Sequence, residues 1–341
     1  MRHVSEARRN HSRVARYRVP PLDESDRLSV ARAVVRGLTA SVKRLPSWLL
    51  YDCEGSRLYE RITALPEYYP TRTEEAIVRA HADDIVEASR RGSPEALTVI
   101  ELGAGSATKT ETILDAVLRR QATCCFVPID VSATALFDSA ERIGASHPAV
   151  DVCALPMRYE AAFPFIARLR GAKMALFLGS TVGNLDDADA STLLWALGDA
   201  LGPRGALVLG TDLRKSPSEL LPAYDDAEGV TAAFNMNLLA RLNRELGADF
   251  DARRFRHVAR WNDAASRVEM HLESLAPQRV HVATLDVDVT FAAGETIHTE
   301  SSVKYTERRV DAILGNAGFA RERTWLDEGR RFGVHLARVV A

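Results

Sequence analysis

The stretch that most constrains the fold is Thr98-Val-Ile-Glu-Leu-Gly-Ala-Gly-Ser106, an apolar run that ends in an acid and two closely spaced glycines. The apolar part predicts a buried strand, and residues 107–119 have the apolar spacing of a helix. Gly103 and Gly105 allow a tight turn and a close approach to a ligand, which a Cβ atom would obstruct. The order of strand, glycine turn and helix predicts an α/β unit that binds a nucleoside cofactor.

The cofactor class follows from what this motif contains and lacks. A dinucleotide fingerprint needs a third glycine where Thr108 stands, so the pattern does not favour a diphosphate. A second apolar strand, 125–129, ends at Asp130, where acids of second strands hold ribose hydroxyls, although such an acid is more commonly a helix cap. These features together indicate S-adenosylmethionine, with Glu101, Gly103, Gly105 and Asp130 as candidate contacts.

Composition agrees with a soluble enzyme of one large or two modest domains: 341 residues, 46% hydrophobic, 26% charged, net charge -2. Basic and acidic residues are interspersed, which argues against a nucleic-acid partner. Only residues 3–18 are locally basic, and we expect residues 1–19 to form a disordered tail. The sequence has no apolar stretch near 18 residues and no N-terminal apolar h-region, so we expect a cytoplasmic protein without membrane contact. The four cysteines show no C-x-x-C spacing, so neither a disulfide framework nor a metal site is expected.

The remaining pattern predicts a doubly wound sheet with an insertion. Strands at 173–178 and 205–210, with a helix at 188–201 between them, continue the β-α-β alternation. A helix at 305–315 closed by glycine, followed by strands at 321–327 and 333–340, completes a methyltransferase-type sheet. Residues 214–304 interrupt it with a helical segment at 217–246 and alternating strands within 280–291.

The predicted fold is therefore α/β, a Rossmann-like class I methyltransferase sheet with an inserted α+β domain. Residues 79–213 and 305–341 would form the S-adenosylmethionine-binding domain. Residues 20–78 and 214–304 would form the substrate-binding domain, with the substrate between the two domains.

Several long motifs are more specific than these patterns. They are Tyr51-Asp-Cys-Glu-Gly-Ser56, Leu65-Pro-Glu-Tyr-Tyr-Pro-Thr-Arg-Thr-Glu74, Phe177-Leu-Gly-Ser-Thr-Val-Gly-Asn184, Ala223-Tyr-Asp-Asp-Ala-Glu-Gly-Val-Thr-Ala-Ala-Phe-Asn235 and Thr299-Glu-Ser-Ser-Val-Lys304. From about residue 38 to the C-terminus the chain resembles the L-histidine Nα-methyltransferase family of ergothioneine biosynthesis. The resemblance implies three methyl transfers from S-adenosylmethionine to the α-amino group of L-histidine, which give hercynine.

The resemblance also implies roles at the amino-acid head group. Asn184 and Tyr224 would bind it, Tyr51 would lie near the amine, and Gly179 would lie near the carboxylate. Neutral groups suit this task, because a carboxylate would raise the pKa of the amine and hide its lone pair. The alternatives are a helix N-cap for Asn184, and core tyrosines with surface hydroxyls for Tyr224 and Tyr68.

At the other end, the resemblance implies that Glu300 and Ser302 bind the imidazole, with Met270 in the pocket wall and Tyr68 near the ring. An acceptor and a donor suit a ring that has one N–H and one acceptor nitrogen. Residues two apart on a strand share a face, so Glu300 and Ser302 can point together into a pocket. The alternatives are a solvated strand charge for Glu300 and core packing for Met270.

For the cofactor, the resemblance adds Lys109, whose alternative is a solvent-facing helix lysine. The chain departs from the family at Arg158-Tyr159, where relatives commonly have an Asp-Phe pair by the adenine; Tyr159 could still cover that ring. It also departs at Tyr59, where phenylalanine is usual.

The predicted mechanism is in-line displacement without a metal, with Tyr51 or an ordered water relaying the proton that leaves the amine. The predicted partner is a small-molecule amino acid, and the predicted state is a monomer. Two alternatives stay open at this stage: an N-methyltransferase of another amino acid, such as a tryptophan derivative, and a ligand-binding sensor without activity.

Overall fold

A computed structural model describes residues 24–91 and 93–340, so the predicted tail at 1–19 lies outside the described residues. The central sheet has the strand order β12-β13-β6-β5-β1-β2-β3, and β4 also pairs with β2. Its strands are β1 (Leu97–Leu102), β2 (Cys124–Asp130), β3 (Val150–Val152), β4 (Leu155–Pro156), β5 (Ala172–Phe177), β6 (Ala206–Asp212), β12 (Phe319–Leu326) and β13 (Phe332–Val339). β13 is antiparallel to both of its neighbours, whereas the strands from β6 to β3 run parallel.

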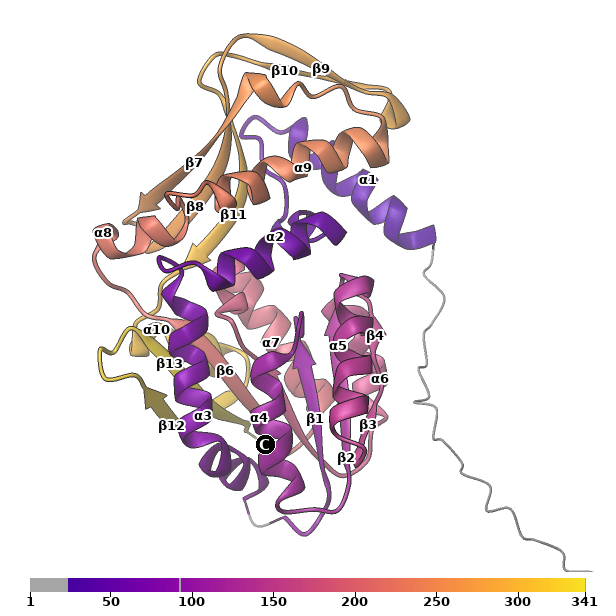
Figure 1. Ribbon diagram of the computed structural model, residues 1–341, viewed down its shortest axis with the longest axis vertical. Coiled ribbons are helices and arrows are strands. Elements are labelled where there is room, and N and C mark those ends of the chain that lie inside the picture. Colours follow the sequence, from indigo (N-terminus) through magenta and orange to yellow (C-terminus); the bar gives the residue numbers. More distant parts are fainter. Residues whose placement is uncertain (1–23, 92, 341) are drawn as a thin grey trace, which may run out of the picture.

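Helices cover both faces of this sheet (Figure 1). The apolar core on one face includes side chains of α3 (Tyr69–Arg90), α4 (Thr108–Leu118) and α5 (Ala133–Ser146). The core on the other face includes side chains of α6 (Tyr159–Ala167), α7 (Asp187–Leu201) and α10 (Glu307–Asn316). Parallel strands buried on both faces are near-continuous apolar runs, which is how these strands read in the sequence. The doubly wound class I fold is confirmed.

A second layer lies over the sheet's carboxyl edge, at the top of Figure 1. It contains a three-stranded sheet in the order β11-β8-β7 and the hairpin β9-β10. Its strands are β7 (Phe255–Asn262), β8 (Arg267–Ser274), β9 (Gln278–Val282), β10 (Val287–Phe291) and β11 (Thr296–Val303). Its helices are α1 (Glu24–Leu38), α2 (Cys53–Ala64), α8 (Pro217–Leu220) and α9 (Val230–Leu246), with short 3-10 helices η1 (Ser47–Leu50), η3 (Leu221–Ala223), η4 (Ala252–Arg254) and η5 (Ala283–Leu285).

One hydrophobic cluster joins the two parts of this layer, since it combines buried side chains from residues 30–69 with others from residues 220–297. Helix α3 runs without a break across the predicted domain limit at 78/79. Tyr69, near its start, belongs to this upper cluster, whereas Ile77 belongs to the core on the sheet. The domain limits themselves stay a prediction.

Three predicted elements differ from the structure. The helix expected at 217–246 is interrupted, because the Asp226 carboxylate accepts the amides of Val230 (2.9 Å) and Thr231 (2.7 Å) and so starts α9 anew. The strand pattern within 280–291 folds as a hairpin, with Asp286 left-handed at the turn (φ 48°). Gly315 lies inside α10 and does not close it. Among the described residues, no helix has the length and apolar character needed to cross a membrane.

Candidate active site

The glycine turn after β1 is held tightly against the end of β2. The amides of Gly103 and Ala104 donate to the Ile129 carbonyl (2.8 and 3.2 Å). The Asp130 carboxylate accepts the Gly105 amide at 2.9 Å. Gly103 has φ 71°, and a Cβ atom there would lie 2.9 Å from the Tyr159 hydroxyl oxygen. The turn therefore needs glycine for its backbone angle, and a Cβ atom at Gly103 would also displace the Tyr159 hydroxyl.

Glu101, at the end of β1, carries an unused acceptor. Its carboxylate is buried, and one oxygen accepts the Thr110 hydroxyl at 2.6 Å. The other oxygen has no hydrogen-bond partner among the described residues. Burial raises the pKa of Glu101 to about 8, although the Thr110 hydrogen bond opposes that rise. A buried carboxyl oxygen without a partner beside a cleft is expected to form a hydrogen bond with a ligand.

The predicted cofactor residues line one large cleft: Glu101, Gly103, Gly105, Lys109, Asp130 and Tyr159. The glycine backbone, the free Glu101 oxygen and the Asp130 carboxylate offer a close approach and acceptors for amino and hydroxyl donors. This set fits a nucleoside that bears an amino group, as S-adenosylmethionine does. Burial raises the pKa of Asp130, and the amides of Ser132 and Gly105 oppose that rise.

The predicted substrate residues line a smaller cavity: Tyr51, Tyr68, Gly179, Asn184, Tyr224, Met270, Glu300 and Ser302. Tyr51, Gly179, Asn184 and Glu300 line both the cavity and the cleft. The two sites are therefore continuous, and the structure brings all the predicted site residues together around them. The roles of the individual residues stay predictions.

The loop after β5 supplies the head-group end of the cavity. Gly179 has φ 74°, and Asn184 is the last residue of the 3-10 helix η2 (Thr181–Asn184). The helix-cap alternative for Asn184 is wrong, because Asp186 caps α7 by accepting the Asp189 amide at 2.9 Å. The Asn184 amide is thus available to the cavity that it lines.

A buried carboxylate links this loop to the cofactor side. Glu74 is fully buried, and both of its oxygens lie 2.8 Å from the Gly179 amide nitrogen. It also forms an ion pair with Lys109. The alternative of a solvent-facing Lys109 is therefore wrong. The sequence analysis included Glu74 only as the last residue of a family motif and assigned it no role, because a glutamate on an amphipathic helix gives no signal of a contact 105 residues away.

Tyrosine rings form one wall of the cavity. The ring centroids lie 5.5 Å apart for Tyr51 and Tyr59, 6.3 Å for Tyr59 and Tyr68, and 6.4 Å for Tyr68 and Tyr224. The Tyr59 and Tyr68 hydroxyls are 3.4 Å apart. Burial, and after it the charge of Glu300, raises the pKa of Tyr51 well above its usual value. The Tyr51 phenol is therefore protonated at any physiological pH.

Glu300 and Ser302 approach the cavity from β11, and Met270 faces them from β8, where it pairs with Glu300 in register. Burial raises the pKa of Glu300 to about 7, although the charge of Lys304 opposes that rise. The alternative of a solvated strand charge is wrong for a carboxylate that lines the cavity and whose pKa is raised by burial. Met270 lines the cavity and also belongs to the hydrophobic core, so the structure agrees both with the predicted pocket wall and with the core-packing alternative.

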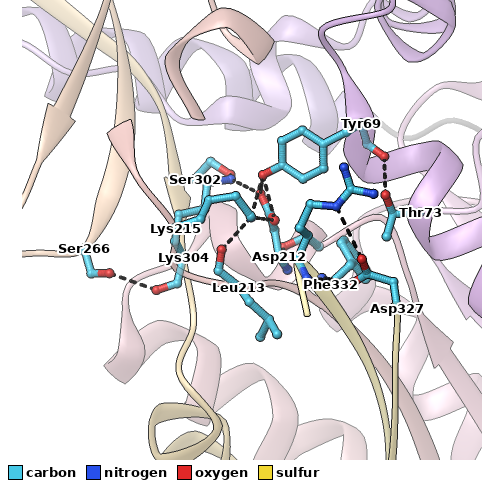
Figure 2. A network of polar contacts seen from close by, with 12 residues as sticks. Tyr69, Thr73, Asp212, Leu213, Lys215, Ser266, Ser302, Lys304, Asp327 and Phe332 are labelled. Atoms are coloured by element: carbon cyan, nitrogen blue, oxygen red, sulfur yellow. Dashed lines mark hydrogen bonds and ion pairs between the residues drawn. The ribbon is translucent and has the colours of Figure 1, made fainter. Parts of the chain in front are cut away.

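A buried polar network that the sequence analysis missed lies against the cavity, and its central residue, Asp212, is one of the lining residues (Figure 2). Asp212, the last residue of β6, accepts the Tyr69 hydroxyl (2.8 Å), the Lys215 ammonium (2.6 Å) and the Lys304 ammonium (2.7 Å). Lys304 also donates to the hydroxyls of Tyr224 (2.6 Å) and Ser302 (2.9 Å). The tyrosine alternative with surface hydroxyls is therefore wrong for Tyr224. The position of Asp212 at the carboxyl end of a parallel strand was the available signal.

A family model described as "Histidine-specific methyltransferase, SAM-dependent" matches residues 30–339. The chain belongs to this family. The methyltransferase is 44% identical over 309 residues to the histidine N-alpha-methyltransferase of Mycolicibacterium smegmatis, across 91% of this chain and 94% of that relative. It is also 44% identical over 315 residues to the histidine N-alpha-methyltransferase of Mycobacterium tuberculosis, across 92% and 96%.

A more distant relative is ergothioneine biosynthesis protein 1 of Neurospora crassa, which is 28% identical over 300 residues. The match covers 86% of the methyltransferase and 33% of that protein. The family model spans elements of both layers, from α1 to β13. The cleft and the cavity therefore belong to a methyltransferase that uses S-adenosylmethionine, and the sensor alternative is set aside.

Proposed function

We propose that this methyltransferase transfers three methyl groups from S-adenosylmethionine to the α-amino group of L-histidine and so makes hercynine for ergothioneine biosynthesis. The observation that carries the proposal is the continuity of the two sites. A small cavity with polar groups at both ends opens into the cleft of the glycine turn, and Tyr51, Gly179 and Asn184 line both. The names of the relatives support histidine as the substrate.

The two ends of the cavity suit the two ends of histidine. Asn184, on the loop after β5, offers an amide that can donate to the carboxylate or accept from the amine. On β11, Glu300 offers an acceptor to a ring N–H, and Ser302 offers a hydroxyl to the other ring nitrogen. Met270 and the tyrosine rings provide apolar surface between these ends. Such a pocket selects substrates by the polarity and the length of their side chains.

Catalysis in this arrangement comes mainly from positioning. When bound, S-adenosylmethionine supplies an electrophilic methyl group on a positively charged sulfur. Glu101, Gly103, Gly105, Asp130, Lys109 and Tyr159 would hold it. The residues around the cavity orient the amine toward the cleft and exclude water, which can contribute many powers of ten to a rate.

Tyr51 has a specific part in the handling of the amine proton. Because its pKa is raised by burial and by Glu300, its phenol acts as a hydrogen-bonding group and not as a strong base. It can accept a hydrogen bond from the amine while its own hydrogen passes to another acceptor. The amine must therefore lose its proton largely through its own acidity, and we expect activity to rise on the alkaline side of neutrality. The reaction stops at three methyl groups because the product has no N–H left.

The competing proposal is an N-methyltransferase of another amino acid, such as a tryptophan derivative. An indole has one N–H and no acceptor nitrogen, so it could use Glu300 but would leave the Ser302 hydroxyl without a partner. Initial rates with histidine, tryptophan and other amino acids, measured as release of S-adenosylhomocysteine, separate the two. A kcat/KM for histidine that exceeds the others by about 10- to 100-fold is expected, since an unpaired buried polar group costs about 1–3 kcal/mol.

We further propose that the enzyme acts on a small molecule alone, as a cytoplasmic monomer. Its interspersed charges support the absence of a nucleic-acid partner. Light scattering of the purified protein at working concentrations tests the monomer, and a mass of twice the chain would contradict it.

A further inference from the structure

The hydroxyl of Ser302 is fixed in its direction by two buried donors. Lys304 is fully buried, and its ammonium donates to Asp212 (2.7 Å), to the Tyr224 hydroxyl (2.6 Å) and to the Ser302 hydroxyl (2.9 Å). An ammonium has three hydrogens and no acceptor, so these three bonds use all of its capacity. Figure 2 shows Lys304 between Asp212 and Ser302.

The Tyr224 hydroxyl completes the arrangement. It accepts from Lys304, so its own hydrogen is free to be donated, and it lies 2.7 Å from the Ser302 oxygen, to which it donates. The Ser302 oxygen thus accepts two hydrogen bonds, which is the full acceptor capacity of a hydroxyl. Its remaining capacity is its own hydrogen, for which residues 24–91 and 93–340 provide no recorded acceptor.

Ser302 lines the cavity, so this hydrogen is available to a ligand there. We infer that Lys304 is a positioning residue that makes Ser302 an obligate donor, so that the site accepts only a ring with an acceptor nitrogen at Ser302. For an imidazole, this selects the neutral ring in the one tautomer whose hydrogen faces Glu300. An imidazolium carries two N–H groups and no acceptor. One of these N–H groups would face the hydrogen of the Ser302 hydroxyl, and the positive charge of Lys304 next to Ser302 would repel the ring.

The inference rests on the proposed function insofar as the ring of the substrate occupies this end of the cavity. Asp212 does not depend on Lys304 alone, because Lys215 and Tyr69 also donate to it. Replacing Lys304 therefore leaves the Asp212 carboxylate paired while it frees the Ser302 hydroxyl to turn toward Tyr224. Lys215 offers a matched control, since it is a second ammonium on Asp212 that has no recorded bond to Tyr224 or Ser302.

The test uses two classes of ring analogue and binding instead of turnover. Thiazolylalanines present a ring nitrogen acceptor without an N–H, and pyrrolylalanines present an N–H without an acceptor. Both attachment isomers of each are used, so that either ring position can face Ser302. Calorimetry in the presence of S-adenosylhomocysteine gives the dissociation constants, and the quantity compared is the Kd ratio of the best pyrrolylalanine to the best thiazolylalanine.

Ser302→Ala is expected to lower this ratio by about tenfold, the worth of about one hydrogen bond. Lys304→Met is expected to lower it by a similar factor, whereas Lys215→Met leaves it at the wild-type value. A wild-type ratio in Lys304→Met, or an unchanged ratio in Ser302→Ala, would overturn the inference. If Lys304→Met does not fold, Tyr224→Phe removes the other donor to Ser302, and its ratio must also fall; an unchanged ratio overturns the inference as well.

Failure of the proposed function has a different signature. If the variants shifted the ratio as expected but the wild-type enzyme did not methylate histidine, the function would be wrong while the positioning role of Lys304 stood.

Discussion

Replacing Glu300 with Gln tests the imidazole end of the site through its dependence on pH. Burial holds the pKa of Glu300 at about 7, well above its usual value of 4.5. The parameter kcat/KM depends on the ionisation of the free enzyme. With a pKa of about 7, the Glu300 carboxyl is about nine-tenths ionised at pH 8 and about one-tenth ionised at pH 6. Only the ionised form is purely an acceptor, so the contribution of Glu300 is lost as the pH falls through 7.

The magnitude follows from the kind of hydrogen bond. A bond to a charged acceptor contributes about 1.5–3 kcal/mol and a neutral one about 1 kcal/mol, so Glu300→Gln should lower kcat/KM for histidine about tenfold at pH 8. At pH 6, where only about one carboxylate in ten is ionised, the wild-type advantage should shrink to about twofold or less. The ionisation of the substrate's own amine and ring affects both enzymes equally, so it cancels in the ratio of the wild-type kcat/KM to the variant kcat/KM.

The assay is initial-rate release of S-adenosylhomocysteine at low histidine and saturating S-adenosylmethionine, from pH 6 to pH 9. Stability provides the control. A carboxyl whose folded-state pKa is raised makes the fold less stable as the pH rises from about 4.5 to 7. Glu300→Gln removes that loss, so at pH 8 the variant should melt no lower than the wild type. A wild-type to variant ratio that stays constant between pH 6 and pH 8 would refute the reasoning.

Three further substitutions test other parts of the site. Gly103→Ala places a Cβ atom 2.9 Å from the Tyr159 hydroxyl at φ 71°, a backbone angle that costs a non-glycine residue about 1–2 kcal/mol; KM for S-adenosylmethionine should rise about tenfold, and an unchanged KM counts against the cofactor assignment. Tyr51→Phe should lower kcat about tenfold with little change in the affinity for S-adenosylmethionine, because it removes one hydrogen bond that orients the amine; an unchanged kcat would remove Tyr51 from the mechanism. Glu74→Gln leaves Lys109 without its counterion at a cost of about 3 kcal/mol, so the melting temperature should fall by several degrees, and a calorimetric Tm equal to that of the wild type would show that the pair contributes nothing.

Local patterns predicted the cofactor turn, whereas the substrate residues were predicted from the resemblance to the family, with strand geometry in agreement. The glycine turn after β1 and the acid at the end of β2 are each predicted from a short continuous segment. The fold then brings these two strand ends together. The two-residue period of a strand placed Glu300 and Ser302 on one face, and both line the cavity. Such signals depend on the backbone geometry of a single element.

Contacts between distant segments were not predictable in the same way. Lys304 and Asp212 are 92 residues apart, and nothing in either strand end specifies that one ammonium will bond a carboxylate and two hydroxyls. The break before α9 was also missed, because apolar spacing continues through it while Asp226 supplies the cap. Charged residues and helix caps whose partners are distant in the sequence produce no periodic pattern, so their contacts could not be predicted.

The measurement that tests the central claim most directly is fragmentation mass spectrometry of the product formed from L-histidine and S-adenosylmethionine. The account predicts successive gains of one, two and three methyl groups, with fragments that place all three on the α-nitrogen and an unmodified imidazole. Unmodified histidine, or a methyl group on a ring nitrogen, would contradict it.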